Sequence, residues 1–548
     1  MAWRHRNHCR KVRAEHAPLR ASPLPPPTSR SLAAAAAVAE LAERAFARAA
    51  GSPSTDGNAV RLLCDARENY PAWREALSGA KRYILFEQYI VENDSVGREF
   101  AMLLAERARA GVRVHVVVDW LGCWRALSLW RAVRDAGADV RVFNPPQLSS
   151  PLGWLSRDHR KTIVVDGEVG FVSGLCLSER WLGNPKRRLE PWRDTGIEIR
   201  GPAVAALEQA FAGVIAASGE PIDTSVFKQA QDIATAGDMR LHVVANEPNL
   251  AGTFRMDLVI ASIAHRELWL TDAYFVATSP YVQALRAAAR DGVDVRLLVP
   301  GASDIPALSP LSRAQYRPLL ESGVRVFEWA GTMLHAKTAV ADRRWSRVGS
   351  TNLNLASWMS NYELDVAIEN AAFADQLASQ YEADLSRSTE IVLTRRNRVR
   401  RAPSAEAVLD QGMQRASRRA ASGSAGRAAA GAFSVGSALG AALTDRRILG
   451  PAEAGLLFLM ALVACVVGII GALWPRVLAW PVAVIAIWSG LAWAAKGLSL
   501  RRHKPSGPRV EQLEDAMQVN VDTPQAPGNE QGSEKDTAAR ARDRVVSR

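Results

Sequence analysis

The sequence predicts an α/β protein made of two similar halves that pack together as a pseudo-dimer, followed by a C-terminal hairpin of two transmembrane helices. Three observations lead to this expectation. The middle of the chain contains one pattern twice, each copy alternates helical stretches with short Val-rich runs, and two long stretches near the C-terminus lack charge. The chain has 548 residues, 48% of them hydrophobic, which predicts two or three domains and excludes a chain that is disordered throughout.

Residues 1–57 are expected to form a basic and largely disordered N-terminal extension. The first 30 residues hold seven Lys or Arg against one acid, and they are rich in Pro. No secretory signal is recognisable there, which predicts that the folded body stays on the cytoplasmic side of the membrane. The five cysteines are scattered and include no CxxC pair, so we expect neither a disulfide framework nor a zinc ribbon.

The two halves are expected at residues 58–225 and 226–394. The segment "RAGVRVHVVVD" at 109–119 matches "RDGVDVRLLVP" at 290–300, and a second pair of similar Val-rich runs follows at 136–143 and 321–329. Each run comes after a helical stretch and a Gly, which is typical of β-α-β units in a largely parallel sheet. A site at the interface of two such halves would receive equivalent residues from each.

The C-terminal part is expected to comprise a basic linker at 395–447, a transmembrane hairpin at 448–496 and a disordered tail at 497–548. Within the hairpin, residues 454–474 and 477–495 carry no charge. As helices they would span roughly 32 and 28 Å, close to the ~30 Å thickness of bilayer hydrocarbon. Basic residues flank both ends and the turn holds a single Arg, so the positive-inside rule predicts that both ends are cytoplasmic.

The formal charge of +12 lies outside the two halves. Residues 1–30, 395–427 and 428–504 each hold an excess of Lys and Arg, whereas residues 31–394 hold a slight excess of acids. A nucleic-acid enzyme usually carries its positive charge on the catalytic body. The distribution therefore predicts no nucleic-acid partner and favours an anionic membrane surface that the flanking segments touch.

The most informative repeat is a motif, His-x-Lys-x-x-x-x-Asp, that occurs once in each half. It lies in "DHRKTIVVDG", which begins at Asp158, and in "LHAKTAVAD", which begins at Leu334. A strand would place the His and the Lys, two residues apart, on the same face. A lone His is usually an ordinary core residue, but two copies at matching offsets predict a site. Its candidate catalytic residues are His159, Lys161, Asp166, His335, Lys337 and Asp342.

These residue types suit phosphodiester chemistry. One His can attack phosphorus and form a phosphohistidine, while the other protonates the leaving alkoxide and then deprotonates an incoming alcohol or water. The two lysines, with Ser350 and Asn352 as phosphate-binding donors, can stabilise the pentacoordinate oxyanion. We expect no metal and no cofactor, because two ammonium groups beside the histidines would repel a cation.

The motifs resemble the phospholipase D superfamily over roughly residues 58–394, and more closely its bacterial cardiolipin synthases. Besides the two motifs, "PWRDTGIEIRGPAV" at 191–204 and "NYELDVAIEN" at 361–370 carry the likeness. The resemblance implies two phospholipase D-like α/β/α halves with the site between them. It also implies that His159 is the nucleophile and His335 the acid/base.

The resemblance further implies that Asp194 and Glu363 orient the histidines, each following the histidine of its own half, by 35 and 28 residues. Two departures from the family pattern stand out in the first half. Cys176 and Gly174 occupy the positions of a usual Asn and of a small hydroxyl or glycine, which leaves that half without one oxyanion donor. The paired apolar stretches also lie at the C-terminus, whereas the best-known family members carry theirs at the N-terminus.

Together these features predict a membrane-bound phosphatidyltransferase that makes cardiolipin from phosphatidylglycerol, with its catalytic body on the cytoplasmic side of the bacterial inner membrane. A phospholipase D hydrolase that releases phosphatidic acid would use the same residues with water as acceptor, and the sequence does not separate the two. A non-catalytic membrane scaffold is less favoured, because both sets of His, Lys and Asp are intact.

Overall fold

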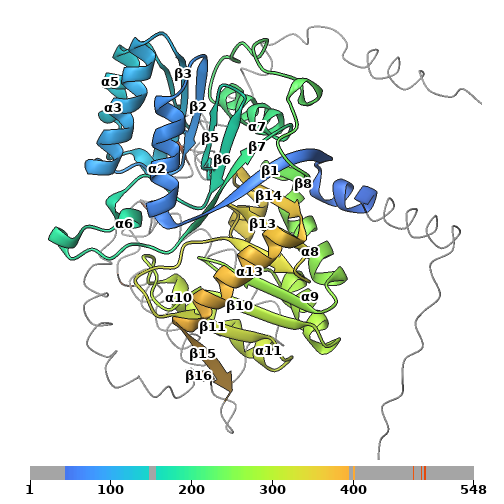
Figure 1. Cartoon of the computed structure of the whole chain (residues 1–548). Helices are drawn as coiled ribbons and strands as arrows, with labels where there is room; N and C mark the ends of the chain where they lie inside the picture. The colour runs from blue at the N-terminus through green and yellow to red at the C-terminus, as the bar shows by residue number, and fades with distance from the viewer. Residues whose placement is uncertain are drawn as a thin grey trace, which may run out of the picture. The chain divides into compact units, whose positions relative to one another are not determined.

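The computed structural model describes residues 43–146, 156–393 and 399–401, with five further positions between 473 and 488. The strands within residues 54–401 form one continuous sheet of sixteen strands (Figure 1). The strands of the first half are β1 (Ser54–Cys64), β2 (Tyr83–Gln88), β3 (Arg113–Asp119), β4 (Asp139–Phe143), β5 (Thr162–Val165), β6 (Val169–Ser173) and β7 (Thr195–Arg200). Those of the second half are β8 (Met239–Asn246), β9 (Glu267–Thr271), β10 (Asp294–Pro300), β11 (Arg325–Trp329), β12 (Thr338–Ala341), β13 (Trp345–Gly349), β14 (Glu363–Glu369), β15 (Ser388–Leu393) and β16 (Val399–Arg401).

The described helices follow the same duplicated plan. The first half contains α2 (Asp65–Ser78), α3 (Ser95–Arg109), α4 (Trp120–Cys123), α5 (Leu129–Asp135), α6 (Glu179–Leu182), η2 (Pro185–Arg187) and α7 (Val204–Ala217). The connection to the second half contains η3 (Ala230–Asp232). The second half contains α8 (Gly252–Ile263), α9 (Ser279–Arg290), α10 (Leu308–Ala314), α11 (Tyr316–Leu320), α12 (Leu355–Met359) and α13 (Ala371–Ser386).

The strand order shows the duplication directly. It runs β4-β3-β2-β5-β6-β7-β1 through the first half and continues as β8-β14-β13-β12-β9-β10-β11-β15-β16 through the second. Each strand from β1 to β7 thus has a counterpart seven numbers later, and β1 and β8 join the halves at the centre. The boundary expected at residue 225 falls in the connection between α7 and β8.

The sheet is not largely parallel, and this corrects the sequence prediction. Only the β2-β3-β4 and β9-β10-β11 ladders are parallel among the described strands. The remaining pairs are antiparallel, including β5-β6 and β12-β13, whose first strands lie within the two motifs. Tight turns connect the members of these two pairs, and such short connections can join only antiparallel neighbours. The prediction of parallel β-α-β units was therefore correct for three strands of each half and wrong for the other strands, which pair antiparallel.

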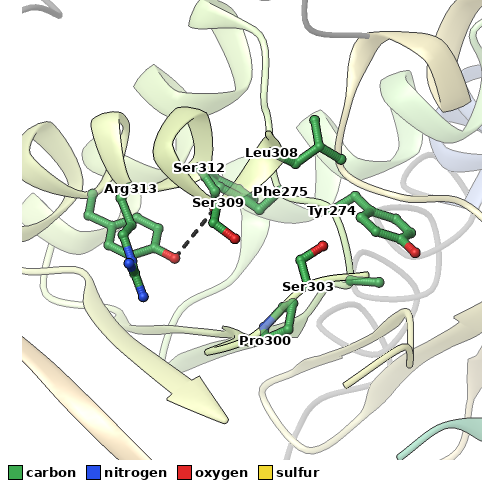
Figure 2. Close-up of a pocket in the computed structure, with 10 residues that line it drawn as sticks. Tyr274, Phe275, Pro300, Ser303, Leu308, Ser309, Ser312 and Arg313 are labelled. Atoms are coloured by element: carbon green, nitrogen blue, oxygen red, sulfur yellow. Dashed lines mark hydrogen bonds between the residues drawn. The ribbon is translucent and has the colours of Figure 1, made fainter. Parts of the chain in front are cut away.

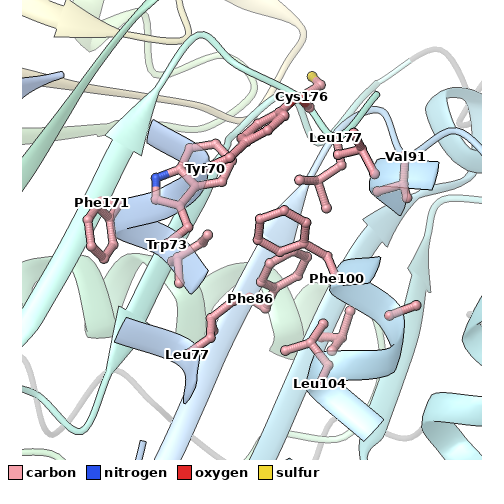
Figure 3. Close-up of a cluster of buried hydrophobic side chains, with 14 of the residues drawn as sticks. Tyr70, Trp73, Leu77, Phe86, Val91, Phe100, Leu104, Phe171, Cys176 and Leu177 are labelled. Carbon is pink, nitrogen blue, oxygen red and sulfur yellow. The ribbon is translucent and has the colours of Figure 1, made fainter. Parts of the chain in front are cut away.

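Three apolar clusters hold helices against the sheet. Residues of β2 alternate between two of them, since Ile84 and Phe86 face α2 and α3, whereas Tyr83 and Leu85 face α7. Figure 3 shows the first cluster, in which Trp73 of α2 meets residues of β2, α3 and β6. The central cluster contains α7 and α13, and the third packs α8, α9 and α11 on the second half. Burial of apolar side chains at about 25 cal/mol per Å² makes these clusters the main stabilising contribution.

The described fold begins earlier than the expected N-terminal boundary at residue 57. Residues 43–50 are helical, and Phe46 of that helix is buried in the third cluster, where its ring lies 4.8 Å from that of His242. β1 starts at Ser54 and pairs with both β7 and β8. Residues 43–57 thus belong to the fold because they bury apolar surface and complete a ladder between the halves.

Several other expectations concern residues outside the described part of the chain. These are the N-terminal residues 1–42 and, apart from β16 and the five single positions, the linker at 395–447, the hairpin at 448–496 and the tail at 497–548. Where the structure does describe helices, none combines the length and the apolar character that a membrane crossing requires.

Candidate active site

Two short parallel bridges join the halves and bring the motif histidines to the same seam. The His159 N–H donates to the Tyr362 carbonyl, just before β14, at 2.9 Å. In the equivalent place of the other half, the His335 N–H donates to the Arg193 carbonyl, just before β7, at 2.7 Å. Each histidine therefore lies beside the start of a strand that belongs to the opposite half.

The histidine and carboxylate pairs cross between the halves. His159 Nδ1 lies 2.8 Å from Glu363 Oε2, and His335 Nδ1 lies 2.8 Å from Asp194 Oδ2. Asp194 and Glu363 thus lie beside the histidines, as expected, but each contacts the histidine of the other half and not the one that it follows in the sequence. The reason is the bridging just described, which puts the first residues of β14 and β7 beside the other half's motif. Neither half alone can assemble a complete His–carboxylate pair.

The carboxylates of Glu363 and Asp194 accept hydrogen bonds from different types of side chain. Ser350 Oγ donates to Glu363 Oε2 at 2.6 Å, whereas the Trp181 indole N–H donates to Asp194 Oδ2 at 2.8 Å. Gly174 occupies the position equivalent to Ser350, and a Cβ placed there would lie 2.2 Å from Asp194 Oδ1. Glycine is thus required where Asp194 approaches the backbone, and the indole replaces the hydroxyl donor. Sequence reasoning missed Trp181.

Burial keeps both imidazoles neutral. Desolvation lowers the pKa of His159 to about 4, against the opposing charge of Glu363. Desolvation, with the charge of Lys337, lowers the pKa of His335 to about 3. Burial alone would favour the neutral forms of Glu363 and Asp194, but the facing histidines hold both carboxyl pKa values below their usual range. Each Nδ1–H then donates to its carboxylate, which leaves Nε2 with a lone pair for chemistry.

The two motif lysines are buried beside the histidines and differ in their contacts. Lys161 Nζ donates to the His159 carbonyl and lies 5.0 Å from the centre of the Tyr89 ring. Lys337 Nζ donates to the His335 carbonyl and also lies 2.9 and 3.1 Å from the two ring nitrogens of that histidine. Desolvation lowers the pKa of Lys337 to about 8. Only the second lysine is thus placed to exchange a proton with its histidine.

The motif aspartates are not part of the site, which corrects their assignment as catalytic residues. Asp166 follows β5 and accepts hydrogen bonds from three consecutive backbone N–H groups at the start of β2, with distances of 2.7–2.9 Å. Asp342 follows β12 and accepts equivalent bonds at the start of β9. Both have positive φ, 57° and 52°, in the turn that reverses the chain. They lie at the far end of each strand from the histidine and fix the turn.

The aligned donor positions differ between the halves. Asn352 is buried, and its Oδ1 has no hydrogen-bond partner among the described residues. Cys176, its counterpart, contributes to the first apolar cluster, and its carbonyl accepts a hydrogen bond from the Tyr70 hydroxyl at 2.5 Å (Figure 3). Burial raises the pKa of the Cys176 thiol, so the group is neutral. Asn352 therefore remains the candidate phosphate-binding donor of the second half. Ser350 donates its single hydroxyl proton to Glu363, so it supports the carboxylate and has none left for a phosphate oxygen.

Aromatic rings surround the histidines, and sequence reasoning missed them as well. The rings of Trp181, Trp192 and Tyr274 lie 5.3, 5.8 and 5.8 Å from that of His335. Tyr89 lies 4.6 Å from His159. These rings exclude water and lower the local dielectric constant, which accounts for the depressed imidazole pKa values. The only sequence signal was the recurrence of aromatic residues near the motif segments.

Two buried arginines fasten the seam. Arg160, inside the first motif, donates to the carbonyls of Glu363, Ala210 and Asn246 at 2.9–3.1 Å. Arg193, next to Asp194, pairs with Asp384 of α13 at 2.9 Å. Both guanidinium groups cross from the first half to the second, so they fix the relative position of the two histidines.

A small pocket adjoins the second half of the site. Tyr274, whose ring contacts His335, forms one wall of it, and α10 forms another (Figure 2). The remaining lining combines apolar groups with hydroxyls and one guanidinium: Ala273, Phe275, Pro300, Ser303, Leu308, Ser309, Ser312, Arg313 and Tyr316.

Comparison with known proteins gives a consistent result. A family model described as cardiolipin synthase, PLD-like domain, matches residues 259–385. The cardiolipin synthase of Alkalihalophilus pseudofirmus is 31% identical over 347 residues, which cover 62% of this chain and 68% of that protein. Cardiolipin synthase A of Pseudomonas aeruginosa is 34% identical over 369 residues, 65% and 73% of the two chains.

A solved structure supports the fold. The crystal structure of the phosphatidylserine synthase of Haemophilus influenzae superposes with a TM-score of 0.50 at 14% identity. The match covers 64% of this chain and 92% of that one. At this identity the likeness shows a shared phospholipase D-like α/β fold and nothing finer.

Proposed function

We propose that this chain, which belongs to the bacterial cardiolipin synthase family of the phospholipase D superfamily, transfers the phosphatidyl group of one phosphatidylglycerol to a hydroxyl of another. The products are cardiolipin and glycerol. Its relatives support the class of reaction, phosphatidyl transfer, and the class of substrate, phospholipids. The observation that carries the residue roles is the crossed pairing of His159 with Glu363 and of His335 with Asp194.

His159 is the nucleophile in this proposal. Its Nδ1–H is held by Glu363, so the lone pair on Nε2 attacks phosphorus, and the bond from phosphorus to the glycerol oxygen breaks as the P–N bond forms. Glu363 stabilises the positive charge that the ring acquires, as the carboxylate of a catalytic triad does. The buried ammonium group of Lys161 stabilises the oxyanion, while the proton of Lys337 is transferred to His335.

His335 handles the protons. The bound phosphodiester anion raises the pKa of His335, and Lys337, 3.1 Å from its Nε2, is placed to supply the proton. The protonated ring gives this proton to the departing glycerol oxygen. In the second step the neutral ring removes the proton from the hydroxyl of a second phosphatidylglycerol, whose oxygen attacks phosphorus and releases His159. Lys161 has no corresponding contact with the His159 ring nitrogens among the described residues, which supports the different roles.

Membrane attachment completes the proposal. The uncharged stretches at 454–474 and 477–495, with their basic flanks, support a hairpin anchored in the bacterial cell membrane with both ends cytoplasmic. The catalytic body would then work at the cytoplasmic surface, where anchoring raises the effective concentration of a lipid acceptor over water. The acidic excess of residues 31–394 supports the absence of a nucleic-acid partner.

The test of the function is the lipid content of a bacterial host that lacks its own cardiolipin synthases. Expression of the full chain should produce cardiolipin, measured by lipid mass spectrometry, whereas the matched His159→Ala chain should not. Phosphatidic acid without cardiolipin would show a hydrolase instead. No change in either lipid, with the protein present in the membrane fraction, would favour a non-catalytic scaffold.

The test of the anchor compares the full chain with one ending after residue 394 on the same phosphatidylglycerol liposomes. The shorter chain keeps every candidate catalytic residue, so it should still cleave lipid. Its ratio of cardiolipin to phosphatidic acid should fall, because water captures more of the phosphohistidine. An unchanged ratio would mean that the pocket alone selects the acceptor.

A further inference from the structure

A group of three potential metal ligands lies at the seam, away from the histidines of the motifs. Among the described residues, Glu43 of the N-terminal helix, His242 of β8 and Glu369 of β14 place one ligand atom each within 4.8 Å of one another. His242 Nε2 lies 3.4 Å from Glu43 Oε1 and 3.9 Å from Glu369 Oε1. Sequence analysis did not group these residues, because they are far apart in the chain.

The His242 ring is oriented as a ligand. Its Nδ1 lies 3.1 Å from the Ser52 carbonyl, which can only accept, so Nδ1 carries the proton and donates it. Nε2 then holds a lone pair that faces the two glutamates. The ring is fully buried, and Nε2 has no hydrogen-bond partner among the described residues. Metal-binding histidines usually donate their second ring N–H to a carbonyl or carboxylate in this way.

The distances fit a metal better than an ion pair. Ligands bound at about 2.0–2.1 Å in a tetrahedron lie about 3.3–3.4 Å apart. The 3.4 Å from Nε2 to Glu43 matches this spacing, and the 3.9 Å from Nε2 to Glu369 exceeds it by about half an ångström. A protonated Nε2 would instead draw an acceptor to about 2.7–3.2 Å. Glu43 and Glu369 are partly exposed, with side-chain exposures of 22% and 38%, so small rotations can close the remaining distance.

Neighbouring charges leave the cluster acidic. Arg240 lies directly across the ladder from Glu369, but its guanidinium is paired with Asp56 at 2.8 Å. An imidazole with two carboxylates is a donor set that suits Zn²⁺ and its first-row neighbours, with water completing the coordination.

We propose that Glu43, His242 and Glu369 form a binding site for a divalent first-row cation of the Zn²⁺ type. The site fastens the helix at 43–50 to β8 and β14, since each of these elements contributes one ligand. Glu369 ends β14 and Glu363 begins it, so the metal lies roughly 20 Å along the strand from the catalytic carboxylate. Its role is structural and independent of the transfer reaction.

The test is Zn²⁺ binding to the full chain in detergent after removal of metals with a chelator. Isothermal titration should show one site, and Zn²⁺ should raise the melting temperature. Glu369→Gln and Glu43→Gln change partly exposed side chains and should fold, and each should weaken Zn²⁺ binding at least about tenfold. Asp238→Asn is the matched control, because it removes an exposed carboxylate just before β8 that belongs neither to the cluster nor to the Asp56–Arg240 pair, and it should change affinity little.

Substitution with Co²⁺ gives a second readout that does not depend on stability. The wild-type chain should show the visible absorption of a tetrahedral or five-coordinate ion, and Glu369→Gln should lose it. The proposal is overturned if the wild-type chain binds neither ion, or if both glutamate variants bind Zn²⁺ as tightly as the Asp238→Asn control.

Discussion

The two halves share one topology but have divided the work of the site. In the second half Lys337 contacts the ring of His335, and Ser350 and Asn352 supply donors. In the first half Lys161 contacts only the backbone of its histidine, and the aligned donor positions hold glycine and a cysteine of the apolar cluster. The two halves therefore share the scaffold, whereas the lysine that contacts a histidine ring and the amide that can bind an oxyanion both lie in the second half.

The crossed carboxylates give the largest test of this division. Glu363→Gln and Asp194→Asn should each lower turnover of phosphatidylglycerol by roughly 10⁴-fold, the size of loss known for the triad carboxylate. A phosphatidyl ester of 4-nitrophenol, whose leaving group needs no acid, separates the two. Asp194→Asn should release nitrophenol at a near-normal rate in the first turnover, whereas Glu363→Gln should not. Equal first-turnover rates for both variants would contradict the assignment.

The aligned donor positions should differ in sensitivity. Asn352→Ala removes an amide from the second half and should lower kcat about 10²–10³-fold, as for loss of one oxyanion donor. Cys176→Ala removes only a neutral, weakly donating thiol and should leave kcat nearly unchanged while lowering the melting temperature. Steady-state rates on phosphatidylglycerol micelles check this. Similar losses of kcat for the two variants would show that the first half also binds the oxyanion.

The pH dependence should also divide between the halves. Attack requires neutral His159, so kcat/KM should fall about tenfold per pH unit below its pKa of about 4. Lys337 must be charged, so the rate should fall again as the pH rises above its pKa of about 8. Lys337→Arg cannot give up a proton in this pH range, so it should lower the rate at every pH and abolish the alkaline limb near pH 8. An alkaline limb unmoved by this substitution would assign it to another group.

The smallest effect on the reaction is expected at the motif aspartates. Asp166→Asn weakens the cap on the start of β2 and should lower the free energy of unfolding by about 1–3 kcal/mol. The rate per folded molecule should be unchanged, because the side chain does not reach the histidines. Denaturant unfolding and active-site titration measure the two quantities separately. A large fall in rate per folded molecule would restore Asp166 to the catalytic group.

The sequence predicted those features that depend on local spacing. The helices α3 and α9, the strands β3 and β10, and the pairing of each motif His with a Lys all follow from short-range patterns. The crossing of Glu363 to His159 could not be predicted, because it depends on the bridge between the halves. The motif aspartates were misassigned because a residue repeated at the same spacing can serve either a turn or a reaction. The sequence alone does not distinguish these two roles.

Contacts between residues that lie far apart in the chain were the second kind of feature that the sequence did not predict. Trp181 supports Asp194 and Arg160 fastens the seam, but neither follows a repeat, because the second half has different residues at those positions. Asymmetric positions are thus where the structure adds most to the sequence, and they are also where the two halves have taken different roles.

The most direct test of the divided site is to locate the covalent intermediate. The His335→Ala chain, given the phosphatidyl ester of 4-nitrophenol, should release one equivalent of nitrophenol and then stop, because nothing activates the acceptor. Mass spectrometry of peptides kept at alkaline pH should place the phosphatidyl group on His159. A burst from His159→Ala with the label on His335, and none from His335→Ala, would contradict the account.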